Sequence, residues 1–289
     1  MYRIAHISDL HISFRDENEN GKKLIDLLKD IEEKKCDHIA ITGDLVENPE
    51  QKDLIYVKEI LSHFNILAST KLSIVPGNHD IFGGATGVPG IIFFPLDCMN
   101  TDYDKNVKMF SGIFGETFDG EESYPYLKVI ENIALIGLNS VDVWSEEKNP
   151  EGSNGRISEE DYSALNKIFS SGKLQNKIKV VLLHHHLYKE EVREDLPAHS
   201  RWLKTIAWKM KLRNKKKLLE FLKKNNVNLI LHGHTHVSEV YNTGGLSVVN
   251  SSAAAVPLTD DMIRKYNIIN IPGEEDTGKN INIETIVLK

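Results

Sequence analysis

The chain has 289 residues, 40% hydrophobic and 27% charged, an ordinary composition for a globular protein with a sizeable core. Its formal net charge of −7 disfavours a nucleic-acid partner for the molecule as a whole. The two cysteines, Cys36 and Cys98, have no CxxC spacing, which indicates neither a disulfide framework nor a thiolate metal site. The first residues do not read as a signal peptide and no apolar run approaches a membrane span, so we expect a cytoplasmic protein.

Strand-like and helix-like patterns alternate at the start of the chain. The polar residues Asp9, Asp44 and Asn78 follow three predicted strands and are separated by 35 and 34 residues, about one β-α-β unit each. Two such units in series predict a parallel sheet with crossover helices. The predicted strands are 2–8, 37–45 and 71–80, and the predicted helices are 21–35 and 53–64.

The middle and end of the chain add more elements. Residues 81–122 lack clear periodicity and are predicted to form a long loop near the site. A helix is predicted over 158–169, with Ser158 as N-cap and Asp161 at the third following position. A hairpin is predicted at 124–141 and a strand at 177–186. Further strands, of a second sheet or its edge, are predicted in GLSVVNSSAAAV, KYNIINI and INIETIVL. With no internal repeat or low-complexity linker, we expect one domain over 1–289.

Residues 201–224 contain ten Lys or Arg and one acid, Glu220. Trp202, Ile206 and Met210 recur every four residues, which predicts that this basic segment begins as an amphipathic helix. Three interpretations stay open: a solvated helix pair packed on the domain, a lid within an insertion at about 187–224, or a surface that rests on an anionic membrane. A nucleic-acid groove is disfavoured because there is no base-reading motif.

The stretch LILHGHTHV, residues 229–237, is a predicted strand that ends in alternating histidines. Residues i and i+2 of a strand share one face, so His234 and His236 could reach one site while Gly233 lets the backbone turn. The alternative is a polar loop that is rich in histidine.

Four other predicted strands also end in Asp, Asn or His, and ligands bind at the carboxyl ends of strands in open α/β sheets. Eight of the twelve histidines lie in these clusters. Carboxylates mixed with imidazoles suit Zn, Mn, Fe or Ni, and a pair of such ions suits phosphoryl transfer. Asp44, from the middle strand of the first three, is the natural bridging ligand. The strand-end residues are Asp9, His11, Asp44, Asn78, His79, Asp80, His184 with its neighbours His185 and His186, and His232, His234 and His236.

Together the sequence motifs that contain these strand-end residues resemble the calcineurin-like metallophosphoesterase superfamily. The resemblance spans residues 9 to 236 and implies a four-layer α-β-β-α sandwich with two mixed sheets. The matching blocks, in family order, are Asp9-Leu10-His11, Gly43-Asp44, Gly77-Asn78-His79-Asp80, His184 and Gly233-His234-Thr235-His236.

The resemblance also implies roles for these residues. One metal would take Asp9, His11, Asp44 and His236, and the other would take Asp44, Asn78, His184 and His234, with His185 as the alternative to His184. A hydroxide between the two divalent or mixed-valence transition-metal ions would attack phosphorus. His79 would donate a hydrogen bond to a phosphoryl oxygen or help the leaving oxygen, and Asp80 would orient His79. The sequence predicts His186 and His232 as packing residues beside the site, His6 and His38 as core or sheet-surface residues, and His63 and His199 as surface or loop residues.

Departures from family branches narrow the substrate class. Protein phosphatases of the superfamily carry an arginine after G-D and another before G-N-H-E, and GDLVEN and VPGNHD have neither. His79 stands where the branch that cleaves a lipid A precursor usually has Arg, and only 53 residues follow His236, too few for the further DNA-binding domain of the Mre11-like nucleases. The segments RIAHISDLHI, HIAITGDL and LHGHTH look most like the cyclic-nucleotide phosphodiesterase and glycerophosphodiesterase branch.

The sequence therefore predicts a metal-dependent phosphodiesterase acting on a small phosphoester, with a cyclic nucleotide or a glycerophosphodiester as candidate substrates. A membrane-associated phosphoesterase for a lipid-linked or nucleotide-sugar substrate, peripheral to the inner face of the membrane, is the main alternative. A phosphomonoesterase, a nuclease and a non-catalytic scaffold are further alternatives. The resemblance also leaves a homodimer open.

Overall fold

The computed structural model describes residues 1–14, 19–84, 94–120, 123–187, 210–252, 254, 264–273, 275 and 280–288. Its strands form a five-stranded sheet in the order β11-β10-β1-β2-β3 and a six-stranded sheet in the order β4-β5-β6-β7-β9-β8. The strands are β1 Tyr2–Ile7, β2 His38–Thr42, β3 Leu72–Val75, β4 Tyr126–Ile130, β5 Ile133–Gly137, β6 Ile178–Leu182, β7 Leu229–His232, β8 Glu239–Thr243, β9 Leu246–Asn250, β10 Lys265–Ile271 and β11 Asn282–Val287. The helices are α1 Glu19–Glu33, α2 Gln51–His63, α4 Tyr103–Ile113, the 3₁₀ turn η1 Gly115–Thr117, α5 Glu159–Ser170 and α7 Lys215–Lys224.

The predicted parallel sheet is confirmed. Strands β1, β2 and β3 are parallel neighbours, with Ile41 paired to Ile7 on one side and to Ile74 on the other. The prediction that KYNIINI and INIETIVL belong to a second sheet is wrong, because they form β10 and β11 of this first sheet. Strand β10 is antiparallel to β1 and β11 is antiparallel to β10, a long-range pairing that the local pattern does not show. In the second sheet β5, β6, β7 and β9 are parallel, whereas β4 and β8 are antiparallel edge strands. Both sheets are therefore mixed, as predicted.

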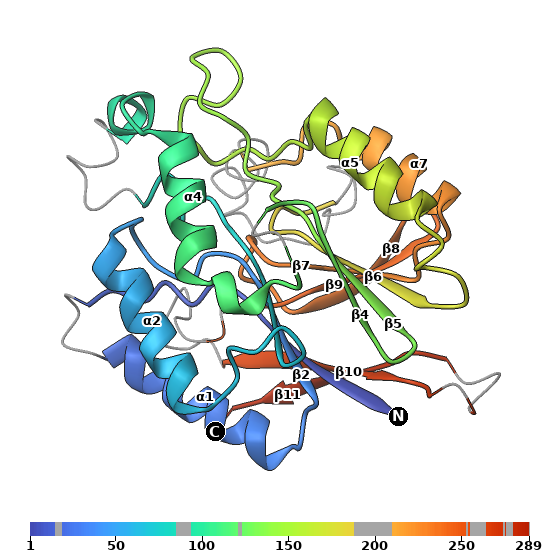
Figure 1. Cartoon of the computed structure of the whole chain (residues 1–289). Coiled ribbons are helices and arrows are strands. Elements are labelled where there is room, and N and C mark those ends of the chain that lie inside the picture. Colours follow the sequence, from blue (N-terminus) through green and yellow to red (C-terminus); the bar gives the residue numbers. More distant parts are fainter. Residues whose placement is uncertain are drawn as a thin grey trace, which may run out of the picture.

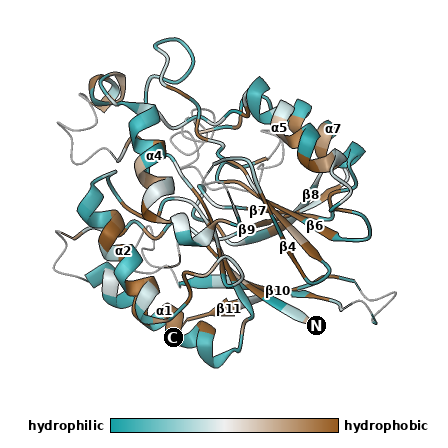
Figure 2. Cartoon of the chain, in the orientation of Figure 1, coloured by the Kyte–Doolittle hydropathy of each residue, from teal (hydrophilic) through white to brown (hydrophobic). Residues whose placement is uncertain are grey.

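Three apolar layers hold four layers of secondary structure together (Figure 1). One buries Leu24 and Leu54 of α1 and α2 against the first sheet, and another buries Leu165 and Leu218 of α5 and α7 against the second sheet. The third lies between the two sheets and includes Ile4. Colouring by hydropathy shows brown residues along the strands and on the inner faces of the helices, with teal outside (Figure 2). The predicted α-β-β-α sandwich is confirmed.

The edges of the two sheets are joined by side chains rather than by backbone pairing. Tyr124 and Tyr126, just before and at the start of β4, each donate a hydroxyl hydrogen bond to the carbonyl of Ile74 in β3, at 3.2 Å. The fully buried Lys128 donates from Nζ to the carbonyl of Leu72, at 2.5 Å. These three donors satisfy carbonyls that an edge strand would otherwise leave open.

The prediction of one long loop over residues 81–122 is wrong for much of its length. Residues 94–99 are helical, and α4 and η1 follow. The side chain of Asp102 caps α4 by accepting the backbone N–H of Lys105. Phe110 and Phe114 are fully buried in the same apolar layer as α1 and α2. Only a few apolar residues on α4 face the core, so the helical period is hard to detect in the sequence.

The predicted N-cap of α5 is confirmed, and Ser158 and Asp161 also exchange side-chain and backbone hydrogen bonds as a capping box. In the basic segment, α7 buries Leu218 and Leu222 in the apolar layer beneath it. Residues 201–209 lie outside the described part of the chain, so the amphipathic helix, lid and membrane interpretations stay predictions there. Among the described residues, no helix combines the length and the apolar character needed to cross a membrane.

Candidate metal centre

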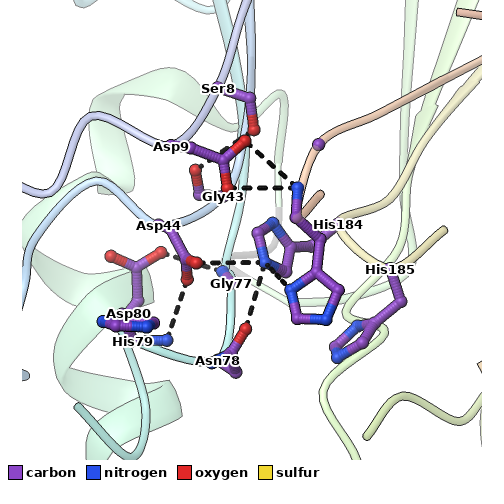
Figure 3. A network of polar contacts seen from close by, with 12 residues as sticks. Ser8, Asp9, Gly43, Asp44, Gly77, Asn78, His79, Asp80, His184 and His185 are labelled. Atoms are coloured by element: carbon purple, nitrogen blue, oxygen red, sulfur yellow. Dashed lines mark hydrogen bonds and ion pairs between the residues drawn. The ribbon is translucent and has the colours of Figure 1, made fainter. Parts of the chain in front are cut away.

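The loops that follow the carboxyl ends of five strands meet at one edge of the sheets. Asp9, Asp44 and Asn78 follow β1, β2 and β3 of the first sheet, and His184 and His234 follow β6 and β7 of the second. Figure 3 shows the network of polar contacts that includes Asp9, Asp44, Asn78 and His184. Backbone donors join these loops to one another. The N–H of His234 lies 3.1 Å from each carboxylate oxygen of Asp9, and the N–H of His79 donates to Oδ1 of Asp44 at 2.8 Å. The structure thus brings the predicted residues together from distant parts of the sequence.

Five of the seven predicted ligands adopt left-handed backbone conformations. Such conformations cost about 1–3 kcal/mol for a non-glycine residue and are concentrated at functional sites. The expectation that His234 and His236 share one face of a strand is wrong, because β7 ends at His232 and both histidines lie in the turn beyond it. The five predicted ligands with left-handed backbone conformations are Asp9 at φ 54°, His11 at φ 46°, Asp44 at φ 53°, His234 at φ 77° and His236 at φ 55°.

Two motif glycines are required by close packing at this edge. A side chain on Gly77 would collide with the carboxylate and the backbone nitrogen of Asp44. A side chain on Gly233 would collide with the hydroxyl of Ser8 and the carboxylate of Asp9. Each glycine therefore lets one loop lie directly against a carboxylate that belongs to another loop.

The first cluster of potential ligands is centred on His184. Its Nε2 lies 3.2 Å from Oδ2 of Asp44, 3.2 Å from Oδ1 of Asn78 and 2.9 Å from Nδ1 of His234. All four residues are buried. One ligand atom from each of Asp44, His184 and His234 lies within 4.8 Å of the others, a spacing that a single ion can bridge.

The second cluster brings Asp9, His11 and His236 together, again with ligand atoms within 4.8 Å of one another. The Nε2 atoms of His11 and His236 are 3.1 Å apart, and Oδ1 of Asp9 lies 3.6 Å from Nε2 of His236. Oδ2 of Asp44 lies 3.9 Å from Nε2 of His11 and 3.2 Å from Nε2 of His184. Asp44 therefore adjoins both clusters, in the place predicted for a bridging carboxylate.

The hydrogen bonds on the far sides of two imidazoles show that the residues fit a cation. Nδ1 of His184 lies 2.7 Å from the carbonyl oxygen of Thr42, and Nε2 of His234 lies 3.1 Å from the carbonyl oxygen of Met210. A carbonyl only accepts, so both of these ring nitrogens carry protons. The opposite nitrogens, 2.9 Å apart, then both present lone pairs, which a cation between them would satisfy. The structure gives this geometry to His184, while Nδ1 of His185 faces the Ser140 hydroxyl.

Glu47, which the sequence analysis did not single out, lies at the rim of the site. Its Oε2 lies 3.1 Å from Nδ1 of His11 and 3.5 Å from Nδ1 of His79, and its carbonyl oxygen lies 3.2 Å from Nδ1 of His79. Burial alone would raise the pKa of Glu47, but hydrogen bonds from the two histidines lower it to about 2. Burial alone would lower the pKa of His79, but Asp44 and Glu47 raise it to about 9. The place of Glu47 three residues after Asp44 puts it near the site but does not indicate its contacts with the two histidines.

Asp80 has partners other than the one predicted for it. Its Oδ1 accepts the backbone N–H groups of Leu45 at 2.9 Å and Val46 at 3.1 Å, and its Oδ2 accepts that of Gly77 at 2.8 Å. The prediction that Asp80 orients His79 is therefore replaced by a different role. The buried carboxylate joins the loop after β2 to the loop after β3, and Glu47 holds the ring of His79.

The remaining histidines that the structure describes occupy the predicted environments. His6 and His38 are buried, and burial lowers the pKa of each to about 3. His232 is also buried, 2.8 Å from the hydroxyl of Tyr241, and His186 stacks on the ring of His234. His63 is exposed, whereas His199 lies outside the described residues.

Comparison with solved structures shows a similar fold in two phosphatases and in a third protein. A dimetal phosphatase from Danio rerio has 12% sequence identity and a TM-score of 0.63, with 94% of this chain and 93% of that chain covered. A purple acid phosphatase from yellow lupin (Lupinus luteus) seeds has 15% identity and a TM-score of 0.55, with 99% of this chain and 53% of that chain covered. A protein of Thermus thermophilus has 13% identity and a TM-score of 0.52, with 99% of this chain and 98% of that chain covered.

No curated protein sequence matches the chain. The calcineurin-like phosphoesterase family, in contrast, matches residues 2–238, which include every residue of the two clusters. Membership of this family indicates a phosphoric ester hydrolase with a binuclear divalent metal centre. The chain belongs to the calcineurin-like phosphoesterase family.

Proposed function

We propose that the protein is a metal-dependent phosphodiesterase. The observation that carries the proposal is the position of Asp44 between two clusters of ligand atoms that come from five loops. Asp9, His11 and His236 would hold one cation, Asn78, His184 and His234 would hold the other, and Asp44 would be shared. When bound, such a pair supplies an activated water nucleophile and neutralises charge on the phosphoryl group.

Glu47 supports a diester as the substrate. Its side chain is 29% exposed at the rim, and its lowered pKa of about 2 keeps it negatively charged at neutral pH. A phosphate monoester carries close to two negative charges at pH 7, while a diester carries one, so this carboxylate repels a monoester more strongly. The segments GDLVEN and VPGNHD also lack the arginines that would clamp a dianion.

His79 is placed to donate to the substrate. Its side chain is 23% exposed, and Nδ1 is held by the carbonyl and the carboxylate of Glu47. This arrangement leaves Nε2 as the ring nitrogen that meets a phosphoryl or leaving oxygen. With a pKa raised to about 9 by Asp44 and Glu47 against the effect of burial, the ring is protonated at pH 7 and can act as general acid.

The substrate class follows from the resemblance of the motifs and not from a bound ligand. We propose a small phosphodiester, either a cyclic nucleotide or a glycerophosphodiester. Screening purified, metal-loaded protein against both classes and against phospholipids would identify the substrate, and Mn, Fe, Zn and Ni would be compared as the resident ions.

The proposal is tested by comparing hydrolysis of bis(p-nitrophenyl) phosphate with that of p-nitrophenyl phosphate in manganese-loaded protein. We expect a higher kcat/KM for the diester. A higher kcat/KM for the monoester would overturn the diesterase assignment while leaving a phosphatase. Absence of turnover with both substrates, in protein shown to contain metal, would instead favour a non-catalytic scaffold.

A further inference from the structure

Ser140 lies behind the ligands of the cation site formed by Asp44, Asn78, His184 and His234. It follows β5, is fully buried, and was not singled out by any sequence motif. Its Oγ lies 3.1 Å from the backbone nitrogen of His184, 3.2 Å from the backbone nitrogen of His185 and 2.9 Å from Nδ1 of the His185 ring. One hydroxyl thus contacts the chain at three points beside a predicted ligand.

Counting donors and acceptors assigns the proton of this hydroxyl. A serine oxygen has two lone pairs and one proton. The N–H groups of His184 and His185 occupy the two lone pairs, so the proton of Ser140 is donated to Nδ1 of His185. The ring of His185 therefore accepts at Nδ1, and its own proton lies on Nε2. Ser140 determines both the backbone position of His184 and the orientation of His185.

The ring of His185 packs against the rings of His234 and His184. Its centroid lies 4.6 Å from that of His234 and 5.3 Å from that of His184. The ring also lies against Gly155, where a side chain would collide with it. The backbone of Gly155 exchanges hydrogen bonds with the short segment 211–213, at 3.0 Å and 2.8 Å. The residue before this segment, Met210, holds Nε2 of His234 through its carbonyl.

We propose that Ser140 is a positioning residue for the cation site centred on His184, acting through the backbone of His184 and the ring of His185. The proposal rests on the proposed function, because it assumes that the protein binds a pair of ions. Removal of the hydroxyl would leave two buried N–H groups without their acceptor and would release the His185 ring. Residues that orient metal ligands typically change metal affinity by about 10–100-fold when they are replaced.

The test is calorimetric titration of metal-free protein with Co²⁺, followed in parallel by visible absorption. For Ser140→Ala we expect one site to keep its affinity and the other to weaken by about 10–100-fold. Asn78→Ala removes a proposed ligand of the His184 site alone and should give the same pattern, whereas His11→Ala should weaken the site that His11 forms with Asp9 and His236. Ser73→Ala is the matched control, because its buried hydroxyl contacts His38 at 2.9 Å, away from the site. We expect the Ser73 variant to lose some stability and to retain both metal affinities.

Two wild-type affinities in Ser140→Ala would overturn the positioning role, as would an equal loss at both sites. If Ser140→Ala does not fold, Ser140→Cys provides the test, because a thiol is similar in shape but a weaker acceptor. It should weaken the His184 site and leave the affinity of the other site unchanged, and two wild-type affinities would overturn the role. Wild-type protein that binds no pair of ions would overturn the proposed function itself, an outcome distinct from these.

Discussion

Oε2 of Glu47 lies 3.1 Å from Nδ1 of His11, on the side of the ring opposite the nitrogen that faces Asp44 and His236. A carboxylate on the outer nitrogen of a ligating histidine fixes its tautomer and makes it a better ligand. The same oxygen lies 3.5 Å from Nδ1 of His79. One partly exposed carboxylate therefore supports both a proposed metal ligand and the proposed general acid.

Replacing Glu47 with Gln should lower kcat/KM for a diester by about 10–100-fold, because an amide keeps the shape but loses the charge that orients both imidazoles. Steady-state kinetics at saturating metal, together with metal titration, checks this expectation. Glu116→Gln is the matched control, since Glu116 pairs with Lys58 on the surface at 2.8 Å and is 61% exposed. Activity of Glu47→Gln equal to that of the control would contradict the role of Glu47.

Asp80→Asn should destabilise the fold. The carboxylate accepts three buried backbone N–H groups, and an amide would turn a donor toward at least one of them, at a cost of about 1–3 kcal/mol. Urea unfolding measures the change, with Asp26→Asn as control because Asp26 is exposed and pairs with Lys29 on the surface of α1. A variant that lost turnover but kept wild-type stability would support the role of orienting His79 instead.

Lys128→Met should stabilise the protein most strongly at or below pH 7. Burial lowers the pKa of Lys128 to about 7, against about 10.4 in an unfolded chain. Between these values the unfolded chain binds a proton that the folded chain lacks, so wild-type stability rises with pH by up to about 1.4 kcal/mol per unit. The Met variant lacks this group, so the difference in stability between Lys128→Met and wild type should shrink as pH rises from 7 to 10.

Denaturant unfolding of wild type and Lys128→Met at pH 6, 8 and 10 checks this sign. Lys52→Met serves as the control, because Lys52 is exposed and pairs with Glu50 at 2.8 Å on the surface. A stability difference between wild type and Lys128→Met that did not vary with pH would show that the buried amine stays protonated in the folded protein.

The sequence predicted the strands that carry the site because buried runs such as 37–45 end sharply at polar residues. It missed β8, whose side chains alternate between half-buried and exposed at the edge of the sheet, and it missed α4, whose contacts with α2 are long-range. Short or half-exposed elements depend on tertiary contacts that local patterns do not show.

The residues of the site also divide into those that local motifs indicate and those that only long-range contacts reveal. Asp9, Asp44 and His184 could be predicted because they belong to spaced motifs at strand ends. Glu47 and Ser140 could not, since their importance comes from contacts with side chains 36 and 45 positions away in the sequence. The contacts of Asp80 are a related case: its carboxylate accepts three backbone N–H groups, from the loops after β2 and β3, which its place beside His79 in the sequence does not indicate.

The central claim is that seven side chains hold two adjacent cations that share Asp44. Elemental analysis of protein loaded with Mn²⁺, combined with anomalous diffraction, tests it most directly. We predict two ions per chain on either side of the Asp44 carboxylate, about 3.5–4 Å apart, and loss of the pair in Asp44→Asn. A loaded chain with no ion between Asp9 and His234, or an Asp44→Asn variant that retains both ions, would contradict the account.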